Sequence, residues 1–101
     1  MTRIYFERTG GFAGLRLSTS VDTQSLDELE ASRLEQEIEQ ANFFHLPARL
    51  QTPSGGADRF EYQIALEQGI RKHTVIVGEA SLPDALRPLV EHLELLMRTR
   101  R

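Results

Sequence analysis

The sequence predicts an α+β domain in which a four-stranded, mainly antiparallel sheet carries two helices on one face. Residues 3–8, 15–18, 59–67 and 70–77 have the two-residue alternation of strands. Residues 25–40, and the segment from Leu82 onward, have the period of amphipathic helices. The order ββαββα lets both helices bury their apolar stripes against one face of the sheet, in a two-layer fold.

Length and composition predict a single domain spanning residues 1–101. The chain has 40% hydrophobic and 27% charged residues, which is ordinary for a soluble globular protein. Its net charge of −3 argues against a nucleic-acid-binding surface. No apolar run approaches the roughly 18 residues of a membrane span, and the N-terminus lacks the apolar core of a signal peptide. We therefore expect a cytoplasmic protein that binds neither nucleic acid nor membrane.

The predicted strands each have one apolar face. Ile4 and Phe6 share a face of the first strand, and Leu15 and Leu17 are expected to be buried beside them in a hairpin. The cleanest alternation lies in the third strand, at Phe60, Tyr62, Ile64 and Leu66.

The first predicted helix begins at a capping box formed by Ser25 and Glu28 and runs to about Gln40. Its expected apolar stripe is Leu26, Leu29, Leu34, Ile38 and Ala41. Its opposite face is acidic, and such a face is either solvated or a docking surface for a basic partner. In the second helix Pro83 suits the first turn, and Pro88 requires a small kink or a delayed start.

A glycine-rich segment, Gly10, Gly11, Phe12, Ala13 and Gly14, connects the first two strands. Glycine reaches positive φ without steric cost, so the segment predicts a shaped loop longer than a two-residue turn. Phe12 either projects from this loop toward a partner or folds back over the sheet and closes the core. Loops carry function more often than scaffolds do, which keeps the first reading open.

The ββαββα order predicts that a second flexible segment lies near this loop. The second strand leads away from the loop and the first helix brings the chain back. Residues 47–58, which include Pro53, Ser54, Gly55 and Gly56, would then lie at the same end of the sheet.

Catalytic and metal-binding patterns are missing. The histidines at positions 45, 73 and 92 are scattered, and the sequence contains no HExxH, GxGxxG or Walker motif. There is no cysteine for a thiolate or a Cys-based metal site. We expect no enzymatic activity and no cofactor, which leaves recognition of a partner.

The chain resembles the emfourin family. The resemblance rests on Thr9-Gly10-Gly11-Phe12-Ala13-Gly14-Leu15-Arg16-Leu17, and it is extended by Phe43-Phe44-x-Leu46-Pro47, by Phe60-x-Tyr62 and by the closing Leu/Pro-rich helix. Emfourins are small bacterial proteins that inhibit thermolysin-like zinc metallopeptidases, commonly of the protealysin type. The resemblance implies a non-catalytic inhibitor with a thermolysin-like (protealysin-type) metallopeptidase as its partner, and the zinc would belong to that partner.

The resemblance also implies a binding surface. The segment 10–14, together with Pro53–Gly56, would cover the catalytic cleft, and Phe12 would enter an apolar specificity pocket. Asp22 or Asp58 would approach the zinc, because carboxylate oxygen is a competent zinc ligand. The alternative is a non-enzymatic interaction or oligomerisation domain that uses the acidic helix or the open sheet face. That face is mostly polar, so we expect a monomer when the protein is free.

Overall fold

The computed structural model describes residues 2–10, 14–50 and 60–99. Its strands are β1 (Thr2–Gly10), β2 (Leu15–Asp22), β3 (Arg49–Leu50), β4 (Phe60–Gln68) and β5 (Arg71–Gly78). Its helices are α1 (Glu28–Gln40) and α2 (Arg87–Thr99), with 3₁₀ turns η1 (Thr23–Ser25), η2 (Phe43–His45) and η3 (Glu79–Ser81).

The described strands form one five-stranded sheet in the order β2-β1-β4-β5-β3. The pairs β1–β2, β1–β4 and β4–β5 are antiparallel, as the sequence predicts. The expected number of four strands is wrong, because β3 adds a fifth that runs parallel to β5. This strand has two residues, Arg49 and Leu50, and is too short to show any alternation in the sequence.

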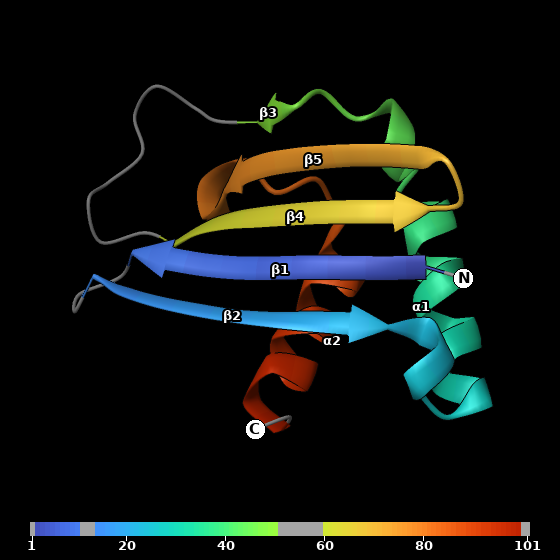
Figure 1. Ribbon diagram of the computed structural model, residues 1–101. Coiled ribbons are helices and arrows are strands. Elements are labelled where there is room, and N and C mark those ends of the chain that lie inside the picture. Colours follow the sequence, from blue (N-terminus) through green and yellow to red (C-terminus); the bar gives the residue numbers. More distant parts are fainter. Residues whose placement is uncertain (1, 11–13, 51–59, 100–101) are drawn as a thin grey trace.

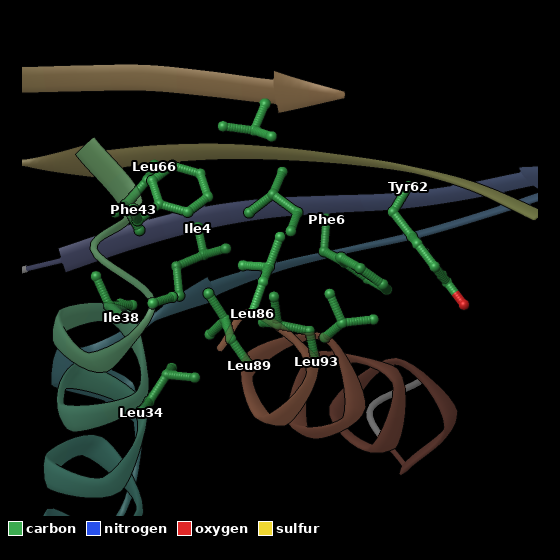
Figure 2. Packing of buried hydrophobic residues seen from close by; sticks show 14 of the residues in the cluster. Ile4, Phe6, Leu34, Ile38, Phe43, Tyr62, Leu66, Leu86, Leu89 and Leu93 are labelled. Atoms are coloured by element: carbon green, nitrogen blue, oxygen red, sulfur yellow. The ribbon is translucent and has the colours of Figure 1, made fainter. Parts of the chain in front are cut away.

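Both helices cover the same face of the sheet, so the predicted α+β class and its two layers are confirmed (Figure 1). The inward side chains of β1, β4 and β5 meet those of α1 and α2 in one core (Figure 2). Its largest fully buried side chains are Phe6, Phe43, Ile4, Leu34, Ile64, Leu66, Leu86, Leu89, Leu93, Val21, Val75 and Val77.

The first half of β2 departs from the prediction. Leu15 and Leu17 are 62% and 41% exposed, although they lie on the same side of the sheet as the buried Val21. The helices lie behind the middle and one end of the sheet, and the β1–β2 hairpin projects beyond them (Figure 1). The period of the strand was therefore predicted correctly, but the extent of the covering layer was not.

The N-cap of the first helix lies two residues later than predicted. Asp27 is the N-cap, and its carboxylate accepts a hydrogen bond of 3.2 Å from the backbone N–H of Leu29. Ser25 belongs instead to η1, where its hydroxyl donates to the carbonyl oxygen of Asp22. The predicted Ser25–Glu28 capping box is thus wrong, and Leu29 is 82% exposed rather than part of the apolar stripe.

The second helix confirms the delayed start, whereas the expected place of Pro83 in its first turn is wrong, because α2 begins four residues after Pro83. It begins at Arg87, which places Pro88 in the first turn, where a missing N–H costs no intrahelical hydrogen bond.

Candidate functional site

The ends of four strands meet at one end of the sheet. Gly10 lies opposite Leu15 in the β1–β2 ladder and opposite Phe60 in the β1–β4 ladder. Gly78 lies opposite Glu61, at the same end. We call this the loop end of the sheet, defined by Gly10, Gly14, Leu15, Phe60 and Gly78.

The described residues that border the two glycine-rich segments lie together at this end. Phe60, the first described residue after segment 51–59, is the direct neighbour of Gly10. Leu50, the last described residue before that segment, lies opposite Val77 near the end of β5. This arrangement of the bordering residues is the one that the ββαββα topology predicts.

Two glycines at the loop end need their lack of a side chain. Gly10 and Gly14 have φ of 99° and 62°, in the left-handed region that other residues rarely adopt. A Cβ added to Gly14 would meet no atom within 4 Å. The requirement for glycine at position 14 is therefore one of backbone conformation and not of space.

A charged side chain joins the loop end to α2. Arg8 Nη1 donates to Glu94 Oε2 at 2.6 Å, and both side chains are 18% exposed. The guanidinium of Arg8 also lies 4.5 Å from the ring centroid of Phe60, within cation–π range. Because Phe60 borders the second segment, one arginine braces the start of β4 against the helix layer.

A second carboxylate holds the start of β4. The backbone N–H of Phe60 donates to Glu79 Oε1 at 3.2 Å, which connects β4 to η3. Beneath these contacts Tyr62 stacks on Phe6 with centroids 5.8 Å apart. Burial raises the pKa of Tyr62 to about 12, and the carboxylates of Glu94 and Glu79 act in the same direction.

Two exposed leucines extend this surface. Leu15 and Leu17 follow the first glycine segment directly and lie on the helix side of β2, outside the core. Sequence reasoning placed them in the core and so missed them as surface residues. The sequence contains one signal that these leucines are exposed. Arg8 follows Ile4 and Phe6 in the alternation of the first strand, where an apolar residue would continue the core. Because Arg8 lies opposite Leu17, it marks where the core ends.

The other predicted contact residues fall into two groups. Asp22 lies at the far end of β2, opposite Arg3, whose Nε is 3.8 Å from Asp22 Oδ2. Its Oδ1 accepts from the backbone N–H of Gln24 at 3.0 Å, so it caps η1. The structure does not bring Asp22 together with the loop end. The remaining predicted residues lie outside the described residues: Gly11, Phe12, Ala13, Pro53, Ser54, Gly55, Gly56 and Asp58.

The acidic face of α1 is partly engaged within the molecule. His92 of α2 contacts Glu37 Oε1 through Nδ1 at 2.7 Å and Glu30 Oε2 through Nε2 at 3.2 Å. Glu35 accepts a hydrogen bond from the hydroxyl of Thr2. These three carboxylates tie α1 to α2 and β1, which weakens the alternative that this face is a free docking surface.

Across residues 2–10, 14–50 and 60–99, no group of three or more His, Asp or Glu side chains has the geometry to hold a metal ion. In the same part of the chain, neither helix is long and apolar enough to cross a membrane.

Fold and surface together define a small two-layer α+β domain whose distinguishing feature is a braced, glycine-bordered loop end. A family model described as Emfourin matches residues 6–94, which is most of the chain. The chain therefore belongs to the emfourin family. Membership of this family agrees with the expectation that the chain is not an enzyme.

The chain is also similar to a solved structure, emfourin from Serratia proteamaculans, which is described as an M4 family peptidase inhibitor. The two share 21% sequence identity over 87% of this chain and 84% of that one, with a TM-score of 0.47. A comparison with curated proteins found no match.

Proposed function

We propose that this chain inhibits a thermolysin-like zinc metallopeptidase of the protealysin type, and that it does so by covering the active-site cleft with its loop end. The observation that carries the proposal is membership of the emfourin family over residues 6–94. The zinc in this complex belongs to the peptidase.

The bracing of the loop end supports this choice of surface. Arg8 and Glu79 fix the start of β4 to α2 and η3 through hydrogen bonds of 2.6 and 3.2 Å. Gly10 lies in the neighbouring strand position. A contact surface that is held in place before binding loses less conformational entropy on association, and this raises affinity.

Within this surface Phe12 is the proposed anchor. Segment 10–14 would lie along the cleft with Pro53–Gly56 beside it, and the ring of Phe12 would occupy an apolar specificity pocket. Binding energy at protein interfaces concentrates in such aromatic anchors. Asp58 remains the candidate for an approach to the zinc, because Asp22 lies at the other end of β2.

The decisive experiment is a titration of purified peptidase with the purified chain. We expect activity of a protealysin-type enzyme, or of thermolysin itself, to fall with increasing inhibitor at fixed substrate. No loss of activity at micromolar inhibitor against several such enzymes would contradict the proposal.

The anchor is tested separately. We expect Phe12→Ala to weaken inhibition by about 2–4 kcal/mol, roughly 30- to 900-fold in the inhibition constant. The free energy of unfolding should stay within about 0.5 kcal/mol of the parent, as for a surface substitution. The opposite result, a large loss of stability with inhibition intact, would assign Phe12 to the core.

A further inference from the structure

The two edges of the sheet differ in how they are protected. On one edge β3 covers β5 only at Ile76 and Val77, and the open start of β5 carries Arg71 and Lys72, charged residues of the kind that discourage pairing. Strand β2, the other edge, has eight residues, and within the described part of the chain it pairs with β1 alone. Its register with β1 is continuous from Asp22 to Leu15. It contains neither proline nor lysine, the residues that commonly block an edge.

The sequence of β2 is complementary to itself. Two antiparallel copies can meet only in registers that place one residue opposite its own counterpart, because opposed residues must have the same hydrogen-bonding orientation. With Thr19 at the centre, Arg16 of each copy lies opposite Asp22 of the other. The opposed pairs in this register are Arg16–Asp22, Leu17–Val21, Ser18–Ser20 and Thr19–Thr19.

The neighbouring registers lack this match. Centred on Ser18, the pairing sets Arg16 against Ser20, and centred on Ser20 it sets Asp22 against Ser18. Only the Thr19-centred register opposes both charges with their opposites. Cross-strand pairs of opposite charge and of apolar or hydroxyl side chains are each favourable.

The sides of the sheet also agree. Arg16 and Asp22 both lie on the uncovered side, as partners in register of Thr9 and Arg3. Leu17 and Val21 both lie on the helix side, opposite Arg8 and Ile4. The proposed pairing therefore sets charge against charge on one side and apolar against apolar on the other.

Neither charge is held by a strong ion pair, and the hydrogen bond that caps η1 uses only Oδ1 of Asp22. Arg16 Nε is 3.6 Å from Glu7 Oε2, with the arginine side chain 74% exposed. Asp22 Oδ2 is 3.8 Å from Arg3 Nε, whose side chain is 64% exposed. Exposed pairs of this kind contribute little free energy, so exchanging or sharing them across an interface costs little.

From these observations we propose that β2 is a self-association edge, at which two copies of the chain pair antiparallel about Thr19 and join their sheets. The sequence-based expectation of a monomer rested on the polar open face, whereas this pairing uses backbone groups of the edge. Because the two β2 strands run in opposite directions, the loop ends lie at opposite ends of the joined sheet. Self-association and inhibition are tested by separate measurements, sedimentation and disulfide trapping for the first and peptidase titration for the second, so the failure of one is distinguishable from the failure of the other.

The register is tested by disulfide trapping. The chain has no cysteine of its own, so any disulfide must form at the introduced residue. Thr19→Cys should give a covalent dimer under mild oxidation, since opposed residues lie about 4.5–5.5 Å apart. Ser18→Cys and Ser20→Cys are matched controls for the two neighbouring registers, where the same cysteine would meet its own counterpart. Trapping of a control variant in preference to Thr19→Cys would overturn the register.

The charge pairing is tested by exchange, with sedimentation at tens of micromolar protein as the readout and circular dichroism to verify folding. The parent should sediment as a dimer, and Arg16→Asp and Asp22→Arg should each weaken association roughly 10- to 100-fold, because like charges then face each other twice. An equimolar mixture of the two variants should recover the dimer, because both contacts then join opposite charges, one in the original sense (Asp22 facing Arg16) and one reversed. A parent that remains monomeric up to roughly millimolar concentration, or folded variants that fail to recover a dimer on mixing, would overturn the proposal. Should Asp22→Arg unfold because it loses the cap of η1, Thr19→Cys trapping decides alone.

Discussion

At the scale of single residues, Arg8 decides where the core of this domain ends. It follows Ile4 and Phe6 on the inward side of β1, yet its guanidinium bonds Glu94 and lies over Phe60. Beyond it, Leu17 and Leu15 are exposed. One charged residue thus separates a buried half of the hairpin from a half that is available for binding.

Removing the partner of Arg8 should destabilise the fold. We expect Glu94→Ala to lower the free energy of unfolding by about 1–3 kcal/mol, because a mostly buried guanidinium loses its charge-assisted hydrogen bond. Urea unfolding of the parent and the variant measures the change. Glu67→Ala, which breaks the exposed pair with Lys72 at 3.7 Å, is the matched control and should cost less than about 1 kcal/mol. Equal costs in the two variants would show that the Arg8–Glu94 pair has no special role.

Tyr62 predicts how stability changes at high pH. Its pKa is about 12 in the folded chain and about 10 when unfolded, so the unfolded state loses the proton first as pH rises. Stability is then complete below about pH 10 and falls by about 2–3 kcal/mol toward pH 12. Tyr62→Phe should remove this part of the fall in urea midpoints measured from pH 9 to 12.

The second tyrosine supplies the control for that measurement. The hydrogen bond to Glu7 raises the pKa of Tyr5, but this phenol lies at the surface. Tyr5→Phe should therefore leave most of the alkaline fall in place. If Tyr5→Phe and Tyr62→Phe flatten the curve equally, burial of Tyr62 is not its main cause.

At the scale of elements, the sequence predicts what periodicity and composition determine and misses what depends on neighbours. Strand β4 was predicted well because four apolar residues alternate along it and all face the helices. Strand β3 was missed because two residues are too few to show an alternation. It pairs with β5 only because η2 places the following residues next to that strand. Leu29 was assigned to the core in error, because at about 100° per residue it lies roughly 140° around α1 from Leu34 and roughly 180° from Ile38, on the face turned away from the sheet.

The start of α1 gives a prediction at this scale. Two residues, Ser25 and Asp27, could cap the helix, and the structure uses Asp27 because η1 takes up Ser25. We expect Asp27→Ala to lower the free energy of unfolding by about 1 kcal/mol, since the N–H of Leu29 loses its acceptor. Ser25→Ala, which removes one exposed hydrogen bond to the Asp22 carbonyl, is the control and should cost less. A larger loss of unfolding free energy in Ser25→Ala than in Asp27→Ala would show that Ser25, as the sequence predicts, is the N-cap of α1.

At the scale of the whole molecule, the position of the loop end could be predicted from strand order, while its extent could not. Antiparallel pairing of β1 with β2 and β4 requires their loop-side ends to meet, which brings Gly10 beside Phe60. Strand order also excludes Asp22 from this end, because Leu15 and Asp22 are the first and last residues of an eight-residue strand. Leu15 is exposed because the helix layer does not extend over it. The sequence of β2 alone cannot predict how far that layer extends.

That exposure leads to a prediction about the inhibitory surface. Leu15 is 62% exposed, lies opposite Gly10 and follows Gly14, so a peptidase that contacts the loop end should bury it. We expect Leu15→Ala to weaken inhibition by about 1–2 kcal/mol, roughly 5- to 30-fold, through lost apolar burial. Its unfolding free energy should change by less than about 0.5 kcal/mol, because no core packing is lost.

Two exposed residues away from the loop end provide matched controls. Leu29, on the first turn of α1, is 82% exposed, and Ile70, in the β4–β5 turn at the opposite end of the sheet, is 100% exposed. Leu29→Ala and Ile70→Ala remove apolar groups of similar size, so they report any general effect of a smaller surface side chain. Inhibition constants for the three variants against one peptidase then locate the contact. A loss confined to Leu15→Ala places the interface at the loop end, whereas a loss in Ile70→Ala with Leu15→Ala unchanged would move it to the opposite end of the sheet.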